Sequence, residues 1–107
     1  MEIEIKIVNS PDQLEFELFD NLYVDDRDAE IGNDIIARYI SAIDGVIDFL
    51  IVLPDTVIED ASSIIASWLY EELKGIESGT LLIANKKTLL ELDDITKKIN
   101  EEINNLG

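Results

Sequence analysis

The amino-acid sequence predicts one α/β domain over residues 1–107, with a mixed, mostly parallel sheet that begins with an N-terminal hairpin. The 107 residues are 47% hydrophobic, which suits a single domain with a substantial core. Short apolar runs that suit strands alternate along the chain with segments whose apolar side chains recur at helical spacing. Such alternation is typical of parallel crossovers, so we expect the element order ββαβαβα.

Two N-terminal segments have the alternating pattern of strands. Residues 2–8 alternate cleanly, which predicts a strand whose three isoleucines face the core. Residues 14–18 alternate again and predict a second strand, paired with the first as a hairpin. The turn between them also fits a helix start, because Ser10, Pro11 and Gln13 could serve as cap, first helical residue and capping-box partner. The alternation favours the hairpin.

The acidic stretch 25–28 does not have the spacing of a calcium-binding loop. We expect it to cap a helix instead, since carboxylates are favourable at a helix N-terminus. That helix is predicted by isoleucines at helical spacing, with Asp34 and Arg38 four residues apart on its other side. Gly45 would end it in a left-handed cap. The isoleucines are Ile31, Ile35, Ile36, Ile40 and Ile43.

The central unit of the chain is a strand, a turn and a helix. Residues 46–53 form an almost unbroken apolar run, which suits a strand covered on both faces. Pro54 stops this strand, and Asp60-Ala61-Ser62-Ser63 offers oxygen-bearing side chains for the free amides of a helix N-terminus. The helix that follows has one apolar face, on which we expect Trp68 to be buried. That face comprises Ile64, Ile65, Trp68, Leu69, Leu73 and Ile76.

A last strand and helix complete the predicted fold. Residues 80–84 suit another short buried strand. Thr88 and Glu91 have the spacing of a capping box at the start of the final helix. Its apolar stripe consists of Leu92, Ile95, Ile99 and Ile103.

The charge of the chain is strongly acidic and unevenly distributed. There are 24 acidic and 8 basic side chains, a net charge of −16, of which −13 falls in residues 1–60. Such a field repels nucleic acid and anionic lipid, and it speeds association with a basic partner. The simpler interpretation is that these acids keep the domain soluble.

The sequence contains neither cysteine nor histidine. Disulfides, thiolate metal sites and the commonest general base are therefore excluded, so we expect no enzyme, no metal and no cofactor. No apolar run approaches the ~20 residues that cross a bilayer, and the N-terminus lacks the basic start of a signal peptide. We therefore expect a cytoplasmic protein without membrane or nucleic-acid partners.

The element order and the central turn resemble the STAS domain of anti-sigma-factor antagonists and their sulfate-transporter relatives, from about Glu2 to Ile95. In that family a hydrophobic strand leads through a short connection into Asp-Ser-Ser-Gly at a helix start. Residues 47–53 look like that strand, and Asp60-Ala61-Ser62-Ser63 looks like that motif. Residues 79–84 are similar to the next strand, and 86–95 to the short helix after it.

The resemblance implies a regulatory module that docks a protein partner, such as an anti-sigma-like kinase, through Asp60, Ala61, Ser62 and Ser63. Family antagonists are switched by phosphorylation on the serine directly after the aspartate, where this chain has Ala61. Ser62 and Ser63 are then the remaining candidates for phosphorylation, unless they only cap the helix.

A second hypothesis fits the composition equally well. A small acidic inhibitor or immunity protein, such as one encoded by a phage, would block a basic surface that normally binds nucleic acid. Both hypotheses describe a protein that binds another protein and performs no reaction. The sequence predicts neither the oligomeric state nor the identity of the partner.

Overall fold

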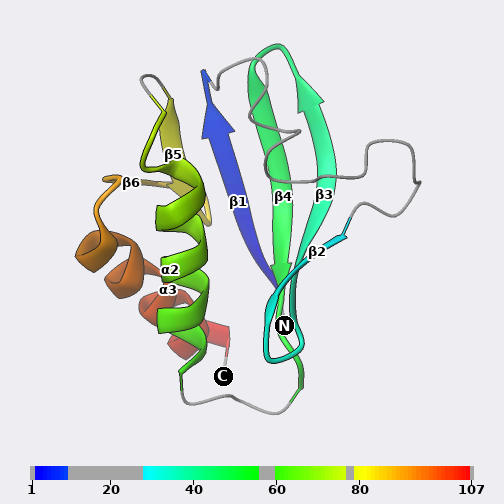
Figure 1. Cartoon of the computed structure of the whole chain (residues 1–107), viewed down its shortest axis with the longest axis vertical. Helices are drawn as coiled ribbons and strands as arrows, with labels where there is room; N and C mark the ends of the chain where they lie inside the picture. The colour runs from blue at the N-terminus through cyan, green and yellow to red at the C-terminus, as the bar shows by residue number, and fades with distance from the viewer. Residues whose placement is uncertain (1, 10–27, 56–59, 77–78, 107) are drawn as a thin grey trace.

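The described part of the chain forms one antiparallel sheet covered by two helices (Figure 1). The computed structural model describes residues 2–9, 28–55, 60–76 and 79–106. The sheet has six strands in the order β2-β3-β4-β1-β5-β6, and each neighbouring pair is antiparallel. The strands are β1 (Glu2–Val8), β2 (Asp28–Gly32), β3 (Ile35–Ile43), β4 (Val46–Val52), β5 (Thr80–Ile83) and β6 (Lys86–Thr88).

The core lies between one face of this sheet and the two helices. In β1, the predicted residues Ile3, Ile5 and Ile7 are buried, which confirms the expected alternation. In β4, Phe49 and its alternate neighbours are also buried, while the residues between them are only partly covered. The predicted strand is thus confirmed over Val46–Val52, but the expected cover on both faces is met only in part, because one face is fully buried and the other half-buried.

Three tight turns join strands that are consecutive in the chain. Each turn has two adjacent residues with positive φ, as the type I′ turns of two-residue hairpins require. Gly45, with φ of 78°, is therefore a hairpin residue between β3 and β4, and not the cap of a helix. The three pairs are Asn33-Asp34, Asp44-Gly45 and Ala84-Asn85.

The helix expected over residues 31–43 is wrong, because this stretch forms the hairpin of β2 and β3. Isoleucine branches at Cβ and favours strands, so isoleucines at intervals of four, one, four and three residues are compatible with either structure. Asp34 sits in the turn and is not a helical partner of Arg38. The Nε of Arg38 instead donates to Oδ1 of Asp28, 3.4 Å away across the ladder.

The expected mostly parallel, STAS-like sheet with the order ββαβαβα is also wrong. β4 and β5 do run in the same direction, since each is antiparallel to β1. However, β1 lies between them and pairs with both, so no parallel ladder forms between β4 and β5. Sequence spacing predicts a crossover from β4 to β5, but it does not reveal that an N-terminal strand is inserted there.

The two described helices are α2 (Ala61–Leu73) and α3 (Leu92–Leu106), and both lie on the same face of the sheet (Figure 1). Their existence confirms the predicted helices, but the predicted caps are wrong. Asp60 occupies the N-cap position of α2 without a side-chain capping bond. Thr88 lies in β6, where its hydroxyl donates to the carbonyl oxygen of Lys86 at 3.1 Å, so it cannot cap α3.

Some predicted elements lie outside the described residues. These are the strand over 14–18, the turn before it and the acids of the 25–28 stretch other than Asp28. Asp28 begins β2 and caps no helix. Among the described helices, neither is long and apolar enough to cross a membrane.

Candidate interaction surface

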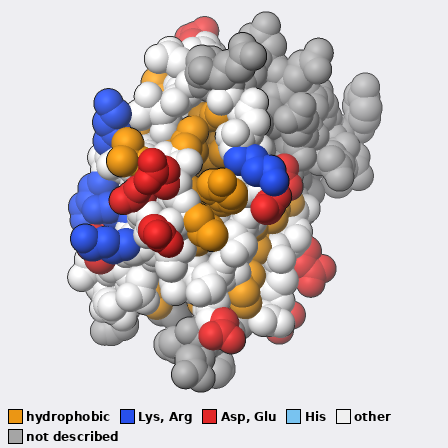
Figure 2. All heavy atoms as spheres, turned by 60° about the vertical axis from the view of Figure 1, so that its left-hand side comes forward, with side chains coloured by type: hydrophobic (Ala, Val, Ile, Leu, Met, Phe, Trp, Pro, Cys, Tyr) orange, Lys and Arg blue, Asp and Glu red, His pale blue; other side chains and the backbone are white. Residues whose placement is uncertain are grey.

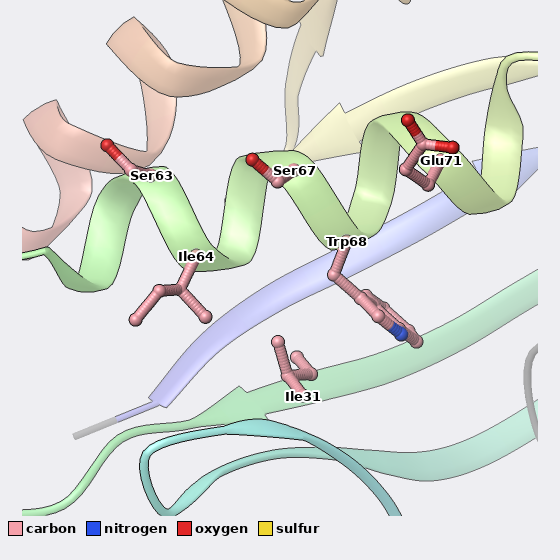
Figure 3. Close-up of a pocket in the computed structure, with 6 residues that line it drawn as sticks. All are labelled: Ile31, Ser63, Ile64, Ser67, Trp68 and Glu71. Carbon is pink, nitrogen blue, oxygen red and sulfur yellow. The ribbon is translucent and has the colours of Figure 1, made fainter.

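A β-bulge in β2 aims one isoleucine toward the first helix of the core. The pairing of β2 with β3 shifts register between Glu30 and Gly32, which leaves Ile31 without a direct partner in the ladder. A bulged residue is free to point in a direction that regular pairing forbids. The side chain of Ile31 accordingly lies toward α2, opposite Ile64 and Trp68 (Figure 3).

The space between Ile31 and α2 is an open groove of about 470 Å³. Ile31 and Ile64 form apolar walls, and the indole of Trp68 extends the apolar surface along the helix (Figure 3). Ser63, Ser67 and Glu71 also line it. We call this feature the α2–β2 groove, defined by Ile31, Ser63, Ile64, Ser67, Trp68 and Glu71.

Trp68 joins the groove to the core. Its ring meets that of Phe49 edge to face, with centroids 6.1 Å apart and an interplanar angle of 84°. Trp68 is only partly buried, whereas Ile65 and Leu69 on the same helix are completely buried. The expected burial of Trp68 is therefore met in part, since one side of the indole packs on the core and the other lines the groove.

Gly32 supplies a backbone conformation that the bulge in β2 uses. A Cβ atom at this position would lie 3.7 Å from Cγ2 of Ile64, which is ordinary contact. The φ of Gly32 is 146°, however, and residues other than glycine rarely adopt it. Gly32 thus permits the backbone path of the bulge, whereas the space beside it would accept a Cβ atom.

The end of the groove carries a paired charge. The carboxylate of Glu71 lies 2.7 Å from Nζ of Lys74, one helical turn further on. A hydrogen bond to this carboxylate, helped by its charge, raises the pKa of Lys74 above its ordinary value. Both side chains are mostly exposed, so the pair contributes little to stability.

A second, acidic hollow lies on the same hairpin. It has a volume of about 310 Å³ and is lined by Asp28, Glu30, Asp34 and Ile36. Only Asp28 among these acids has a described basic partner, the guanidinium of Arg38. Within the described residues, no group of three or more potential ligands is arranged to hold a metal ion. We call Asp28, Glu30 and Asp34 the acidic hairpin.

Lysines gather at the other end of the sheet. Among the described strands, β2 and β6 are the two edges, and β6 carries Lys86 and Lys87. Lys97 and Lys98 follow on α3. Lys86 pairs with Glu102 and Lys98 with Glu101, each at 3.3 Å, and α3 also carries Asp93 and Asp94, so the excess of lysine is confined to β6. Figure 2 shows the side of the molecule with the helices, where hydrophobic side chains reach the surface between acidic and basic ones.

The structure places the predicted docking residues at the start of α2. Asp60 and Ser63 are exposed and Ser62 is half-buried, so these three can be reached from solvent. Ala61 is only 2% exposed and packs in the core. Of the four, Ser63 belongs to the α2–β2 groove, and a hydroxyl introduced at position 61 would be buried.

Sequence reasoning misses the groove because it assigns β2 to a helix. The one available signal is Gly32-Asn33-Asp34, three residues that suit positive φ and therefore a hairpin turn. Comparison with known proteins adds no family to this description. No protein-family model, curated protein or solved structure matches the chain.

Proposed function

We propose that this domain binds a basic surface of another protein and acts by occupying it. The observation that carries the proposal is the acidic hairpin, three carboxylates gathered at one edge of a sheet whose opposite edge carries lysines. The net charge of −16 supplies a long-range field of the same sign.

Charges of opposite sign at the two edges of the sheet orient a basic partner as well as attract it. A basic partner approaching the domain is drawn toward β2 and repelled from the lysines of β6. Electrostatic steering of this kind raises association rates and selects the orientation of the encounter. An inhibitor or immunity protein that competes with nucleic acid for a basic surface needs both properties.

The regulatory role expected from the STAS resemblance has weaker support. That resemblance implies a mostly parallel fold, and the antiparallel sheet differs from it. Docking near the start of α2 remains part of the proposal, because Ser63 adjoins the hairpin through the α2–β2 groove.

The test is capture of partners by the immobilised domain from cells that produce it, followed by identification of the bound proteins. The decisive variant is D28N/E30Q/D34N, which neutralises the acidic hairpin. We expect a basic protein that is bound by the wild type, eluted by raised salt and lost with this variant.

The matched control is D93N/D94N/E101Q, which removes the same number of charges from α3. It should retain the partner. A captured protein that is not basic, or that both triple variants lose equally, would overturn the proposal.

A further inference from the structure

We propose that the sheet face away from the helices docks an amphipathic helix of the basic partner. This inference rests on the proposed function and deepens it by naming the docking face and the form of the partner segment. Both described helices lie on the other face of the sheet, so neither of them covers this one (Figure 1). We call it the outer face.

The outer face has an apolar centre where β3 and β4 pair. Strand residues alternate between the two faces of a sheet, so those between the core residues point outward. Ile36 of β3 pairs directly with Val52 of β4, and Leu50 lies two residues from Val52 on the same face. These three side chains are half-buried, whereas Phe49 and Ile51 are completely buried on the core face. Solvent therefore reaches an apolar surface in the middle of the sheet.

Carboxylates border this centre on both sides. Glu30 of β2 pairs with Ile36 on one side. Glu2 of β1 pairs with Val52 on the other side. One row across four strands therefore has an acid at each end and two apolar residues between them. Both acids are exposed, and neither has a basic partner among the described residues.

The neighbouring row also ends in a carboxylate on each side. Leu50 lies between Glu4 of β1 and Arg38 of β3. Arg38 pairs in turn with Asp28 of β2, and its Nε donates to Oδ1 of that residue at 3.4 Å, which holds the guanidinium toward the β2 edge. The other base on this face is Lys6, 3.7 Å from Glu4. From β1 to β4 the outward-facing charged side chains are five acids and two bases, so the outer face is acidic.

The width of this face fits a helix. Neighbouring strands lie about 4.8 Å apart, so the acids of β2 and of β1 are about 14 Å apart, three such spacings. An α-helix with its side chains is about 10–12 Å across. A helix that lay on Ile36, Leu50 and Val52 would therefore bring cations along its two flanks close to the two rows of carboxylates.

Charge selects this occupant over others. A second copy of the chain, with a net charge of −16, would bring acidic side chains against acidic side chains. Nucleic acid and anionic lipid are repelled for the same reason. A protein helix with one apolar side, flanked by lysine or arginine, matches both the apolar centre and its acidic borders.

The experiment measures the binding of two synthetic helical peptides without tryptophan, by titration calorimetry at low salt. Both peptides contain the same numbers of lysines and leucines. In the amphipathic peptide the leucines lie along one side of the helix with lysines on both flanks, and in the control peptide the leucines are distributed around the helix. We expect the amphipathic peptide to bind about tenfold more tightly, because only its leucines can be buried together.

Trp68, the single tryptophan of the chain, reports on where the peptide binds. It lies on α2 and packs on the core face of the sheet, so a peptide on the outer face should leave its emission unchanged. A shift of Trp68 emission would mean that the peptide binds at the α2–β2 groove instead, and it would overturn the inference.

One pair of variants tests the apolar centre. Leu50→Lys places a cation there and should weaken binding of the amphipathic peptide by about tenfold or more, since it removes apolar surface and repels the lysines. Asn100→Lys makes the same charge change at an exposed position of α3 and should change binding by less than about twofold.

A second pair of variants tests the acidic borders. E2Q/E30Q removes one carboxylate from each border and should weaken binding about fivefold. E91Q/D93N removes the same number of charges at exposed positions beside the start of α3 and should change binding by less than about twofold. Thermal unfolding of each variant shows whether the fold is retained, and E2Q/E30Q decides the matter if Leu50→Lys does not fold.

The outcomes separate this inference from the proposed function. If the two peptides bind equally, or if Leu50→Lys binds like Asn100→Lys, the outer face does not dock the helix. The same results are expected if another segment of the chain already covers this face. If E2Q/E30Q binds like the wild type, the charge argument for the occupant fails and the inference is overturned. In each case the proposed binding of a basic partner, which capture from cells tests, is left intact.

Discussion

The ring of Trp68 packs edge to face on the ring of Phe49, so the residue that lines the α2–β2 groove also contacts the middle of the sheet. Phe49 is completely buried, and it pairs with Ile5 of β1 on one side and Tyr39 of β3 on the other. An occupant of the groove would therefore contact a side chain that is itself packed on the core.

The two rings should differ in their contribution to stability. Phe49→Ala removes a fully buried ring and should lower the free energy of unfolding by about 3–5 kcal/mol. Trp68→Ala exposes less new surface, because the indole is already partly exposed, and should cost about 2 kcal/mol. Urea unfolding followed by circular dichroism measures both. Equal losses would mean that Trp68 is a core residue rather than a groove residue.

Asp48 should make the stability of the domain depend on pH. It lies on the sheet face away from the helices, opposite Lys6, and its buried Oδ1 has no hydrogen-bond partner among the described residues. Burial raises the pKa of Asp48 above its ordinary value of 3.8, Glu4 raises it further, and Lys6 opposes the shift. The native state thus binds a proton more tightly than the unfolded chain does.

At pH values above the pKa of Asp48 in the folded protein, its ionised carboxylate lowers the free energy of unfolding. This loss of stability disappears as the pH falls toward 3.8. Asp48→Asn should therefore be more stable than the wild type at pH 7, with the difference narrowing toward about pH 4. Asp55→Asn, at an exposed position, is the control and should show no such trend. Denaturant unfolding across this pH range makes the comparison, and a constant difference for Asp48→Asn would contradict it.

Gly45 should tolerate a side chain poorly in the β3–β4 turn. Its φ is 78°, so Gly45→Ala should cost about 1–2 kcal/mol through backbone strain. Gly75 follows α2, has no positive φ and has open space where a Cβ atom would lie, so Gly75→Ala should be neutral or stabilising by up to about 1 kcal/mol. Thermal melts of the two variants decide the point, and equal destabilisation would argue against the hairpin turn.

A negative charge at Ser63 should strengthen binding to a basic partner. Ser63→Asp adds a carboxylate to the α2–β2 groove, and we expect affinity for a synthetic lysine-rich peptide to rise a few-fold. Ser62→Asp adds the same charge one residue away from the groove lining and should have a smaller effect. A phosphate-controlled switch of the STAS type predicts the opposite sign, so weaker binding by Ser63→Asp would favour that mechanism.

Salt should act mainly on the rate of association. The acidic hairpin steers a basic partner through a field that is screened over about 8 Å at physiological ionic strength. Stopped-flow association of a lysine-rich peptide should slow at least tenfold between low and high salt, with a smaller change in the dissociation rate. An association rate that does not change with salt would mean that the acidic side chains only keep the domain soluble.

The sequence predicts the local elements better than their arrangement. The alternation of β1, the run of β4 and the apolar stripes of α2 and α3 each follow from burial of one face, so they are recognisable. The β2–β3 hairpin is not, because isoleucines around Gly32 fit a helical repeat as well as an alternating one. The positive φ angles of Asn33 and Asp34, which these residue types tolerate, decide in favour of the hairpin.

The candidate site is predictable only in part. Ser63 is singled out by the sequence and lies in the groove, but the sequence assigns Ile31 and Trp68 to the core faces of helices. A groove forms between elements that are distant in the chain, so it depends on strand order. That order in turn depends on β1, whose place between β4 and β5 leaves no local signal.

The position of β1 also bears on how the chain folds as it is synthesised. Of the described strands, β1 leaves the ribosome well before its two ladder partners, β4 and β5. The hairpins from β2 to β4 and from β5 to β6 can form locally, whereas seating β1 requires closure of long loops. The β1–β4 ladder can form once β4 has emerged, but the other edge of β1 stays open to pairing with other chains until β5 has followed.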